Sequence, residues 1–178
     1  MTHLAVSAIG VDRPGIVAAV TGVLVDRGCN LEDSSMSILR GRFAMMLVVS
    51  NPAGIDAHDL ETALVAATTG MELRVMVHAI DDEVPRSPEG DSWTVSVYGA
   101  DRPGIVHQVT QLLADEGVNV VDLTTHVIGE KARPVYAMLV DVTIPASTDS
   151  TVVVDRLQAL AAELGVSCSA HLVEPDIL

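Results

Sequence analysis

A six-residue segment, Asp-Arg-Pro-Gly-Ile-Val, occurs twice in the chain, at residues 12–17 and again at residues 101–106. Each copy follows a short run in which apolar and polar residues alternate, which is typical of a half-buried strand. Each copy leads into apolar residues spaced i, i+1, i+4, i+7 and i+8, which form one face of an amphipathic helix. The segment is therefore predicted to be a strand-to-helix turn that presents free backbone N–H groups at a helix N-terminus.

The proline and the glycine of each copy fit such a turn. We expect Pro14 and Pro103 to lie in the first helical turn, because the N–H that proline lacks has no helical partner there. Gly15 and Gly104 have no side chain, so a bound molecule could approach the backbone closely at the same place. The turn is thus a candidate for binding as well as for folding.

The similarity between the two halves extends well beyond these turns. Gly28 and Gly117 are expected to end the two helices, and Asn30 and Asn119 follow at equivalent positions. The alignment shifts only at a hairpin loop, predicted at residues 129–134, that is longer in the second half. A duplication with its insertion at a loop predicts one domain at residues 1–80 and another at 92–178. Residues 81–91, which are acidic and contain two prolines, are the expected linker.

Each half shows the order strand, helix, strand, strand, helix, strand. That order predicts an α+β fold of two ferredoxin-like βαββαβ units, each an antiparallel sheet of four strands in the order 4-1-3-2 with two helices on one face. In the first unit the expected strands are 3–9, 30–39, 43–50 and 72–79, and the helices 14–27 and 56–68. In the second they are 92–98, 119–128, 135–144 and 167–173, and 103–116 and 148–164.

The third strands of the two units differ. In the second unit, one face of residues 135–144 is wholly apolar and the other becomes polar halfway along. In the first unit, residues 43–49 are apolar on both faces, and such a strand is usually covered on both. We therefore expect the open side of the first sheet to pack on the second unit or on another copy of the chain.

Composition excludes several classes of function. A formal net charge of −14 opposes a general nucleic-acid footprint and binding to an anionic membrane surface. No apolar run reaches the roughly 18 residues of a membrane span, and no signal peptide is recognised, so we expect a cytoplasmic protein. Cys29 and Cys168 are expected to be small buried hydrophobes rather than a disulfide.

No residue pattern indicates catalysis, a metal or a cofactor. His78 and His171 are equivalent, so a shared sheet position explains them better than a metal site does. His107 and His126 lack a partner at metal-ligand spacing. No activated Ser–His or Cys–His pattern and no dinucleotide fingerprint occurs. We therefore expect neither a catalytic nor a metal-binding residue, and no cofactor.

A ferredoxin-like unit whose first strand ends in Gly-x-Asp-Arg-Pro-Gly-Ile-Val resembles the ACT domain, a small regulatory module that binds amino acids and related metabolites. Two such units in tandem are similar to the family of glycine cleavage system transcriptional repressors. The resemblance implies that effectors lie at an interface between two ACT units, held by the turn after the first strand and by the start of the second. On this sequence those positions are Asp12, Arg13, Pro14, Gly15, Ile16, Val17, Asn30 and Leu31, with Asp101, Arg102, Pro103, Gly104, Ile105, Val106, Asn119 and Val120.

The chemistry of these positions suits an amino acid. A helix N-terminus attracts a carboxylate through its free N–H groups and its dipole, and Asn30, Asn119 or a nearby Asp could take the ammonium group. Other roles stay open. The residues Asp12 and Asp101 could only order their own turns, the two arginines could be solvated or paired, and the two asparagines could be turn residues.

The surroundings of the two turns are not equivalent. The first helix continues with Ala18 and Ala19, whereas the second continues with His107 and Gln108. The bulkier polar groups could shape a polar pocket or fill it. We expect the first turn to be the roomier one.

These observations and the resemblance favour a non-catalytic regulator that binds an amino acid or a related small metabolite at an ACT–ACT interface. It is expected to signal to a protein partner, as a homo-oligomer and preferably a dimer. Any role in regulating transcription is expected to act through that partner rather than by direct contact with nucleic acid. The alternative is a regulatory subunit that acts in trans on an amino-acid metabolic enzyme. Direct RNA binding through the sheet aromatics Trp93, Tyr98 and Tyr136 is disfavoured by the charge.

Overall fold

The computed structural model describes residues 2–80, 89–128 and 135–173, which form two compact units at residues 1–85 and 86–178. Most of the predicted linker (residues 81–88) and the predicted hairpin loop at 129–134 lie outside the described residues. Gly90 and Asp91, which we expected in the linker, begin the first strand of the second unit.

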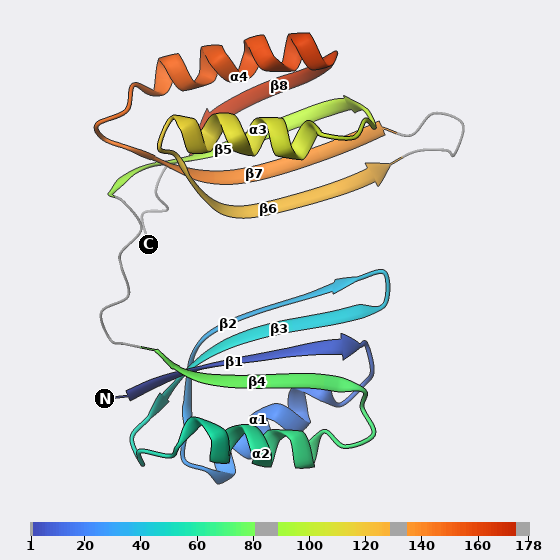
Figure 1. Ribbon diagram of the computed structural model, residues 1–178, viewed down its shortest axis with the longest axis vertical. Coiled ribbons are helices and arrows are strands. Elements are labelled where there is room, and N and C mark those ends of the chain that lie inside the picture. Colours follow the sequence, from blue (N-terminus) through green and yellow to red (C-terminus); the bar gives the residue numbers. More distant parts are fainter. Residues whose placement is uncertain (1, 81–88, 129–134, 174–178) are drawn as a thin grey trace. The chain divides into compact units, whose positions relative to one another are not determined.

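Both units have the predicted order of elements and the predicted sheet. Neighbouring strands are antiparallel and are ordered β2-β3-β1-β4 and β6-β7-β5-β8, the expected 4-1-3-2 arrangement. Two helices lie on one face of each sheet (Figure 1), which confirms the α+β ferredoxin-like fold. The elements are β1 (Thr2–Val11), α1 (Ile16–Asp26), β2 (Asn30–Leu39), β3 (Arg42–Asn51), α2 (Ala57–Ala67) and β4 (Leu73–Ile80), then β5 (Gly90–Ala100), α3 (Ile105–Asp115), β6 (Asn119–Ile128), β7 (Val135–Pro145), α4 (Ser150–Leu164) and β8 (Val166–Leu172).

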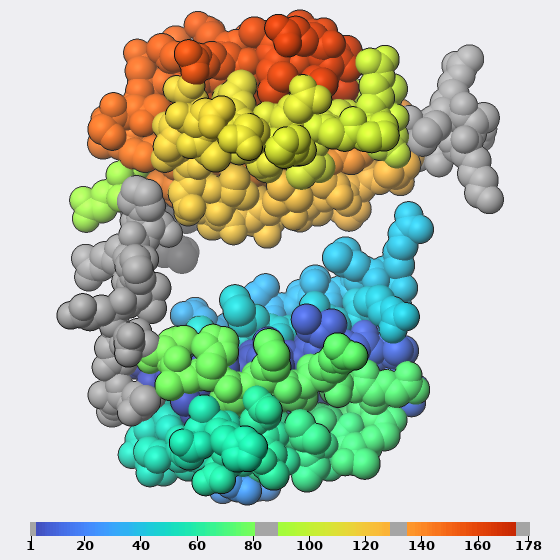
Figure 2. Space-filling view, viewed as in Figure 1, coloured from blue at the N-terminus to red at the C-terminus, as the bar shows by residue number. Residues whose placement is uncertain are grey.

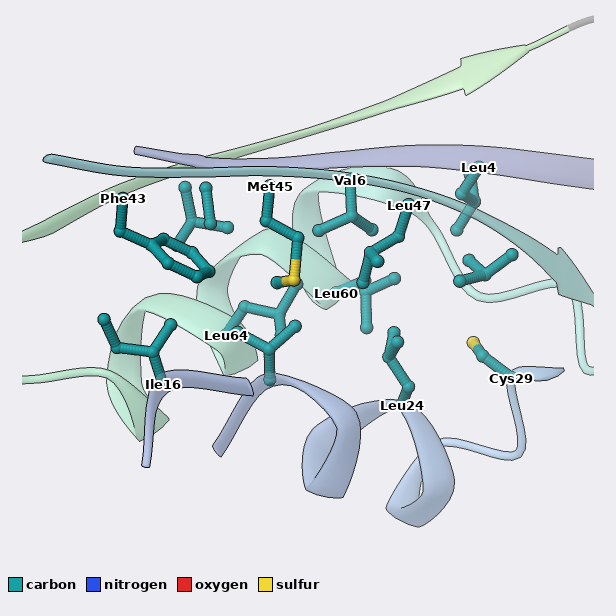
Figure 3. Close-up of a cluster of buried hydrophobic side chains, with 14 residues drawn as sticks. Leu4, Val6, Ile16, Leu24, Cys29, Phe43, Met45, Leu47, Leu60 and Leu64 are labelled. Carbon is teal, nitrogen blue, oxygen red and sulfur yellow. The ribbon is translucent and has the colours of Figure 1, made fainter. Parts of the chain in front are cut away.

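Each unit has its own apolar core between its sheet and its helices. In the first unit, alternate residues of β1 and β3 point towards α1 and α2, where Leu24, Leu60 and Leu64 meet them (Figure 3). In the second unit, one face of β7 is buried as predicted, with Tyr136, Met138, Val140, Val142 and Ile144 all inside the core. Fully buried side chains of this size each stabilise the fold by roughly 1.5–3 kcal/mol, so these faces fix the strand register.

The prediction that Pro14 and Pro103 lie in the first helical turn is wrong. The helices begin two residues later, at Ile16 and Ile105, after an N-cap glycine. Gly15 has φ +94° and Gly104 has φ +95°, a left-handed conformation that no residue inside a right-handed helix adopts. The two glycines are therefore required by the backbone conformation that precedes each helix.

The same helices end at glycine, as predicted. Gly28 and Gly117 have φ +68° and +70°. The N–H of Gly28 donates to Val25 O (3.0 Å), and the N–H of Cys29 donates to Leu24 O (2.9 Å). In the second unit, the N–H of Gly117 donates to Ala114 O (3.0 Å), and the N–H of Val118 donates to Leu113 O (2.9 Å). This is the Schellman arrangement, in which a left-handed glycine satisfies the last helical carbonyls.

The open face of the first sheet is apolar at its centre and is not covered by its own unit. Met46 on β3 and Met76 on β4 flank Ser7 on β1 and are 59% and 62% exposed. Ile9, on the next row of the same face, is 58% exposed. The expectation that the second unit or another copy covers this face stays a prediction.

Replacing both Met46 and Met76 with Glu should release whatever covers this face, because a buried unpaired carboxylate is costly. If another copy covers it, light scattering should show the mass fall towards the 18.7 kDa of one chain. If the second unit covers it, the mass should stay constant while the hydrodynamic radius increases. A variant with the mass and the radius of the wild type would contradict the prediction.

Substituting Gly15 with Ala should destabilise the protein by about 1–2 kcal/mol, because alanine pays a steric penalty at positive φ. Gly22 on the exposed face of α1 is the matched control, since a Cβ there would meet no heavy atom within 4 Å. Its change to Ala should stabilise the helix by about 0.5–1 kcal/mol. Urea denaturation measures both; equal stabilisation by the two changes would contradict the conformational role of Gly15.

Candidate ligand-binding turns

The first candidate turn joins β1 to α1. The N–H of Asp12 donates to Gly41 O (3.0 Å), which fixes the turn against the β2–β3 hairpin. The first helical hydrogen bond runs from Ala19 N to Gly15 O (2.9 Å). The N–H groups of residues 16–18 therefore have no helical acceptor, and none is found for them elsewhere in the described part of the chain.

The second candidate turn, between β5 and α3, repeats this geometry. Its first helical bond runs from Gln108 N to Gly104 O (3.0 Å), so the N–H groups of residues 105–107 have no acceptor among the residues described. Each turn thus presents three adjacent donors at the positive end of a helix dipole. This arrangement suits a carboxylate or another small anion.

The other two helices begin differently. Asp56 caps α2 by accepting a hydrogen bond from His58 N (2.8 Å), and Asp149 caps α4 by accepting one from Thr151 N (2.9 Å). A side-chain cap of this kind accepts a hydrogen bond from one of the backbone N–H groups that a helix start leaves unpaired. Only the helices that follow the repeated segment lack a side-chain cap, among the four helices described.

Both arginines of the repeat form hydrogen bonds within their own units, and Arg13 is also ion-paired, so neither is simply solvated. Arg13 Nη2 lies 2.5 Å from Glu72 Oε1, and Arg13 Nη1 donates to Gly70 O at 3.4 Å. Arg102 Nη1 donates to Leu164 O at 3.1 Å, at the C-terminal end of α4. Arg13 therefore ties its turn to the segment after α2, whereas Arg102 ties its turn to the last residue of α4.

The aspartates of the repeat are exposed and do not order their turns through side-chain hydrogen bonds. Within the described ranges, the carboxylates of Asp12 and Asp101 accept no hydrogen bond. Asp101 does act on Tyr136. The pKa of the Tyr136 phenol is raised mainly by the burial of that side chain and, to a smaller extent, by the negative charge of Asp101. Both carboxylates are free to receive a cationic group.

The asparagines lie far from the turn of their own unit. Asn30 pairs across β3 with Ser50, which pairs in turn with His3 at the start of β1. The turn instead follows Val11 at the other end of β1. Strands rise about 3.3 Å per residue, so these two ends lie about 26 Å apart. The structure therefore does not bring Asn30 and Leu31 to the turn of the first unit.

The second unit has the same separation. Asn119 pairs with Thr143, which pairs with Ser92 near the start of β5, whereas the turn follows Ala100 at its end. Val120, the next residue of β6, also lies at the far end. The structure therefore does not bring Asn119 and Val120 to the turn of the second unit.

One residue beside the first turn, Glu72, was not predicted from the sequence. Glu72, the partner of Arg13, has φ +56°, and its carbonyl oxygen would lie 2.4 Å from a Cβ at Gly10. Gln108 Nε2 would lie 3.5 Å from a Cβ at Gly104, whereas nothing lies within 4 Å of one at Gly15. The first turn is thus the more open one, as expected, and the second has an amide group over it.

Other candidate sites from the sequence are also placed. Trp93 and Tyr136 point into the second core, which leaves Tyr98 as the exposed aromatic side chain among these three and weakens the RNA-binding alternative. Both cysteines are free thiols whose pKa values are raised by burial, so neither is an activated nucleophile. His78 and His171 are exposed on their sheets, and in the described ranges no group of three His, Cys, Asp or Glu residues could hold a metal ion.

The surface of the second unit is hollowed beside its turn. A hollow of about 460 Å³ lies between α3 and α4, and His107 and Gln108, beside the second turn, are among the residues that line it.

None of the helices in the described part of the chain has the length and hydropathy that crossing a membrane requires.

Comparisons with known proteins agree with the repeat. Residues 2–78 match one family model described as ACT domain, and residues 93–162 match another with the same description. The glycine cleavage system transcriptional repressor of Escherichia coli K12 is 27% identical over 173 residues, which span 96% of this chain and 90% of that protein.

Two other proteins are similar to this chain. A phosphoserine phosphatase of Mycobacterium tuberculosis is 28% identical over 144 residues, covering 79% of this chain and 34% of that protein. The crystal structure of an unknown protein from Galdieria sulphuraria is 30% identical, with a TM-score of 0.84 over 97% of this chain and 99% of that one. The chain belongs to the ACT domain family and carries two ACT domains in tandem.

Proposed function

We propose that this chain is a non-catalytic regulatory protein that binds an amino acid or a related small metabolite at an interface between two ACT units and signals to a protein partner. The observation that carries the proposal is the pair of uncapped helix starts, each with three free N–H groups beside an unpaired aspartate. The N–H groups suit the carboxylate of an amino acid and the aspartate suits its ammonium group.

The second strand of each unit supports an interface. All of β2 is exposed, including Met36 and Ile38, which are 52% and 51% exposed although they point to the helix side of the sheet. In Figure 2 the light-blue atoms of the β2–β3 hairpin stand at the surface of the first unit. β2 is also an edge strand, so one row of its backbone groups is unpaired within the unit. In the second unit, Val127 on edge strand β6 is 56% exposed.

Pairing of two such edges would complete the site. If the edges of two units met in antiparallel fashion, the start of one second strand would face the end of the other. The asparagine of one unit, Asn30 or Asn119, would then lie near the strand-to-helix turn of the neighbouring unit. This arrangement accounts for the separation of about 26 Å within one unit, because each site would take its turn from one unit and its asparagine from another.

The comparisons support regulation rather than catalysis. The match to the Escherichia coli protein spans nearly the whole chain, and its name describes a repressor of transcription for the glycine cleavage system. We therefore propose a role in regulating glycine or amino-acid metabolism. The net charge of −14 favours action through a protein partner rather than by direct contact with nucleic acid.

A second candidate is a regulatory subunit that acts in trans on an amino-acid metabolic enzyme. The observation that favours it is the similarity of 144 residues to part of a phosphoserine phosphatase. The match covers 34% of that protein, so an enzyme contains a part that resembles this chain. Affinity capture with the tagged chain from a lysate of its source, followed by mass spectrometry, distinguishes the two. A transcription factor is expected for the first candidate and a metabolic enzyme for the second.

A thermal-shift screen of the twenty common amino acids at millimolar concentration tests the proposal. A ligand present at 100 times its Kd should stabilise the protein by about 2.7 kcal/mol and raise the Tm accordingly. The amide of the same amino acid is the matched control, because it lacks the carboxylate and should give little shift. The proposal fails if no amino acid or related small acid raises the Tm.

A further inference from the structure

We propose that the second turn, at residues 101–105, is the one that holds the ligand, and that Tyr136 and Gln108 bind its carboxylate together with the free N–H groups of α3. The inference rests on the proposed function and adds to it a single occupied turn, its donors and the class of ligand. Both side chains belong to the second unit alone, because their equivalents in the first unit are Phe43 and Ala19.

Tyr136 carries a polar group that the folded unit leaves unused. The residue is only 7% exposed, and its hydroxyl is buried without a hydrogen-bond partner among the described residues. Buried polar groups are nearly always paired, so an unpaired one calls for an explanation. A bound molecule that accepts a hydrogen bond from this hydroxyl is such an explanation.

Tyr136 lies beside the end of β5 that leads into the second turn. Tyr136 pairs with Gly99 on β5, two residues before Asp101, and it shares a core cluster with Ile105, the first residue of α3. Its equivalent Phe43 points from β3 towards Ile16 at the start of α1 (Figure 3). Burial and the charge of Asp101 raise the pKa of the phenol, so it stays protonated and remains a donor.

Other donors gather at the same place. The Gln108 amide nitrogen would lie 3.5 Å from a Cβ at Gly104, the residue that precedes the three free N–H groups. Arg102 donates to the neutral carbonyl of Leu164, so its positive charge is not cancelled, whereas Arg13 in the first unit is ion-paired with Glu72. The second turn is therefore the more favourable of the two for an anionic group.

The arrangement defines a class of ligand. Backbone N–H groups, a phenol and an amide are all donors that suit a carboxylate, and the exposed Asp101 carboxylate suits an adjacent ammonium group. The ligand class is therefore an α-amino acid. The hollow between α3 and α4, which Gln108 lines, leaves room for its side chain. The first turn, with Ala18, Ala19 and Phe43 in the equivalent positions, offers only its backbone groups.

The test is isothermal titration of the full chain with glycine, or with whichever common amino acid gives the largest thermal shift. We expect one bound molecule per chain. Tyr136→Phe should weaken binding by about tenfold or more, as expected for loss of a hydrogen bond to a charged group. The Tm of the ligand-free variant should stay equal or rise, because the variant removes an unpaired buried hydroxyl. A purely structural hydroxyl would instead lower the Tm when removed.

The first unit supplies the matched control. Phe43→Tyr adds a hydroxyl at the equivalent position, so it should lower the ligand-free Tm and leave the affinity unchanged. Gln108→Ala, at an exposed position that does not threaten folding, should also weaken binding about tenfold.

Two equal sites per chain, or unchanged affinity in both Tyr136→Phe and Gln108→Ala, would overturn the inference while leaving the proposed function intact. If no amino acid binds the wild-type chain, the proposed function fails and this inference fails with it.

Discussion

The left-handed backbone at Gly15 and Gly104 is the constraint on which the candidate sites depend. A φ near +95° lets the chain leave the end of a central strand and enter a helix without a side-chain cap. The following N–H groups are then left unpaired, at the positive end of the helix dipole. Asp56 and Asp149 cap the other two helices, α2 and α4, so the uncapped start is a property of the repeated segment and not of the fold in general.

The rest of each unit holds that turn in place. Ile16, Val20 and Leu24 bury one face of α1 against the sheet, and the Schellman arrangement at Gly28 fixes its end. Arg13 connects its turn to the segment after α2, and Arg102 connects its turn to Leu164, the last residue of α4. The exposed pair between Arg13 and Glu72 adds little stability, because both side chains remain in water. Its main consequence is that the charge of Arg13 is neutralised, whereas that of Arg102 is not.

Most of the fold follows from patterns within short segments, but the candidate site does not. Apolar spacing located the helices, yet it could not show that Gly15 rather than Pro14 precedes the first helical residue, because that depends on φ. The order 4-1-3-2 makes β1 and β2 parallel, which places Asn30 at the far end from the turn. Tyr136 was recognised only as a sheet aromatic, since the lack of a partner for its hydroxyl depends on packing across the whole core.

The central claim is that the free N–H groups at the start of α3 hold a carboxylate. An NMR titration of the ¹⁵N-labelled chain with the amino acid that gives the largest thermal shift tests this most directly. The amide signals of Ile105, Val106 and His107 should move downfield as new hydrogen bonds form, while those of residues 16–18 should move much less. Signals that shift only elsewhere, for example around Met46 on the open face of the first sheet, would contradict the account.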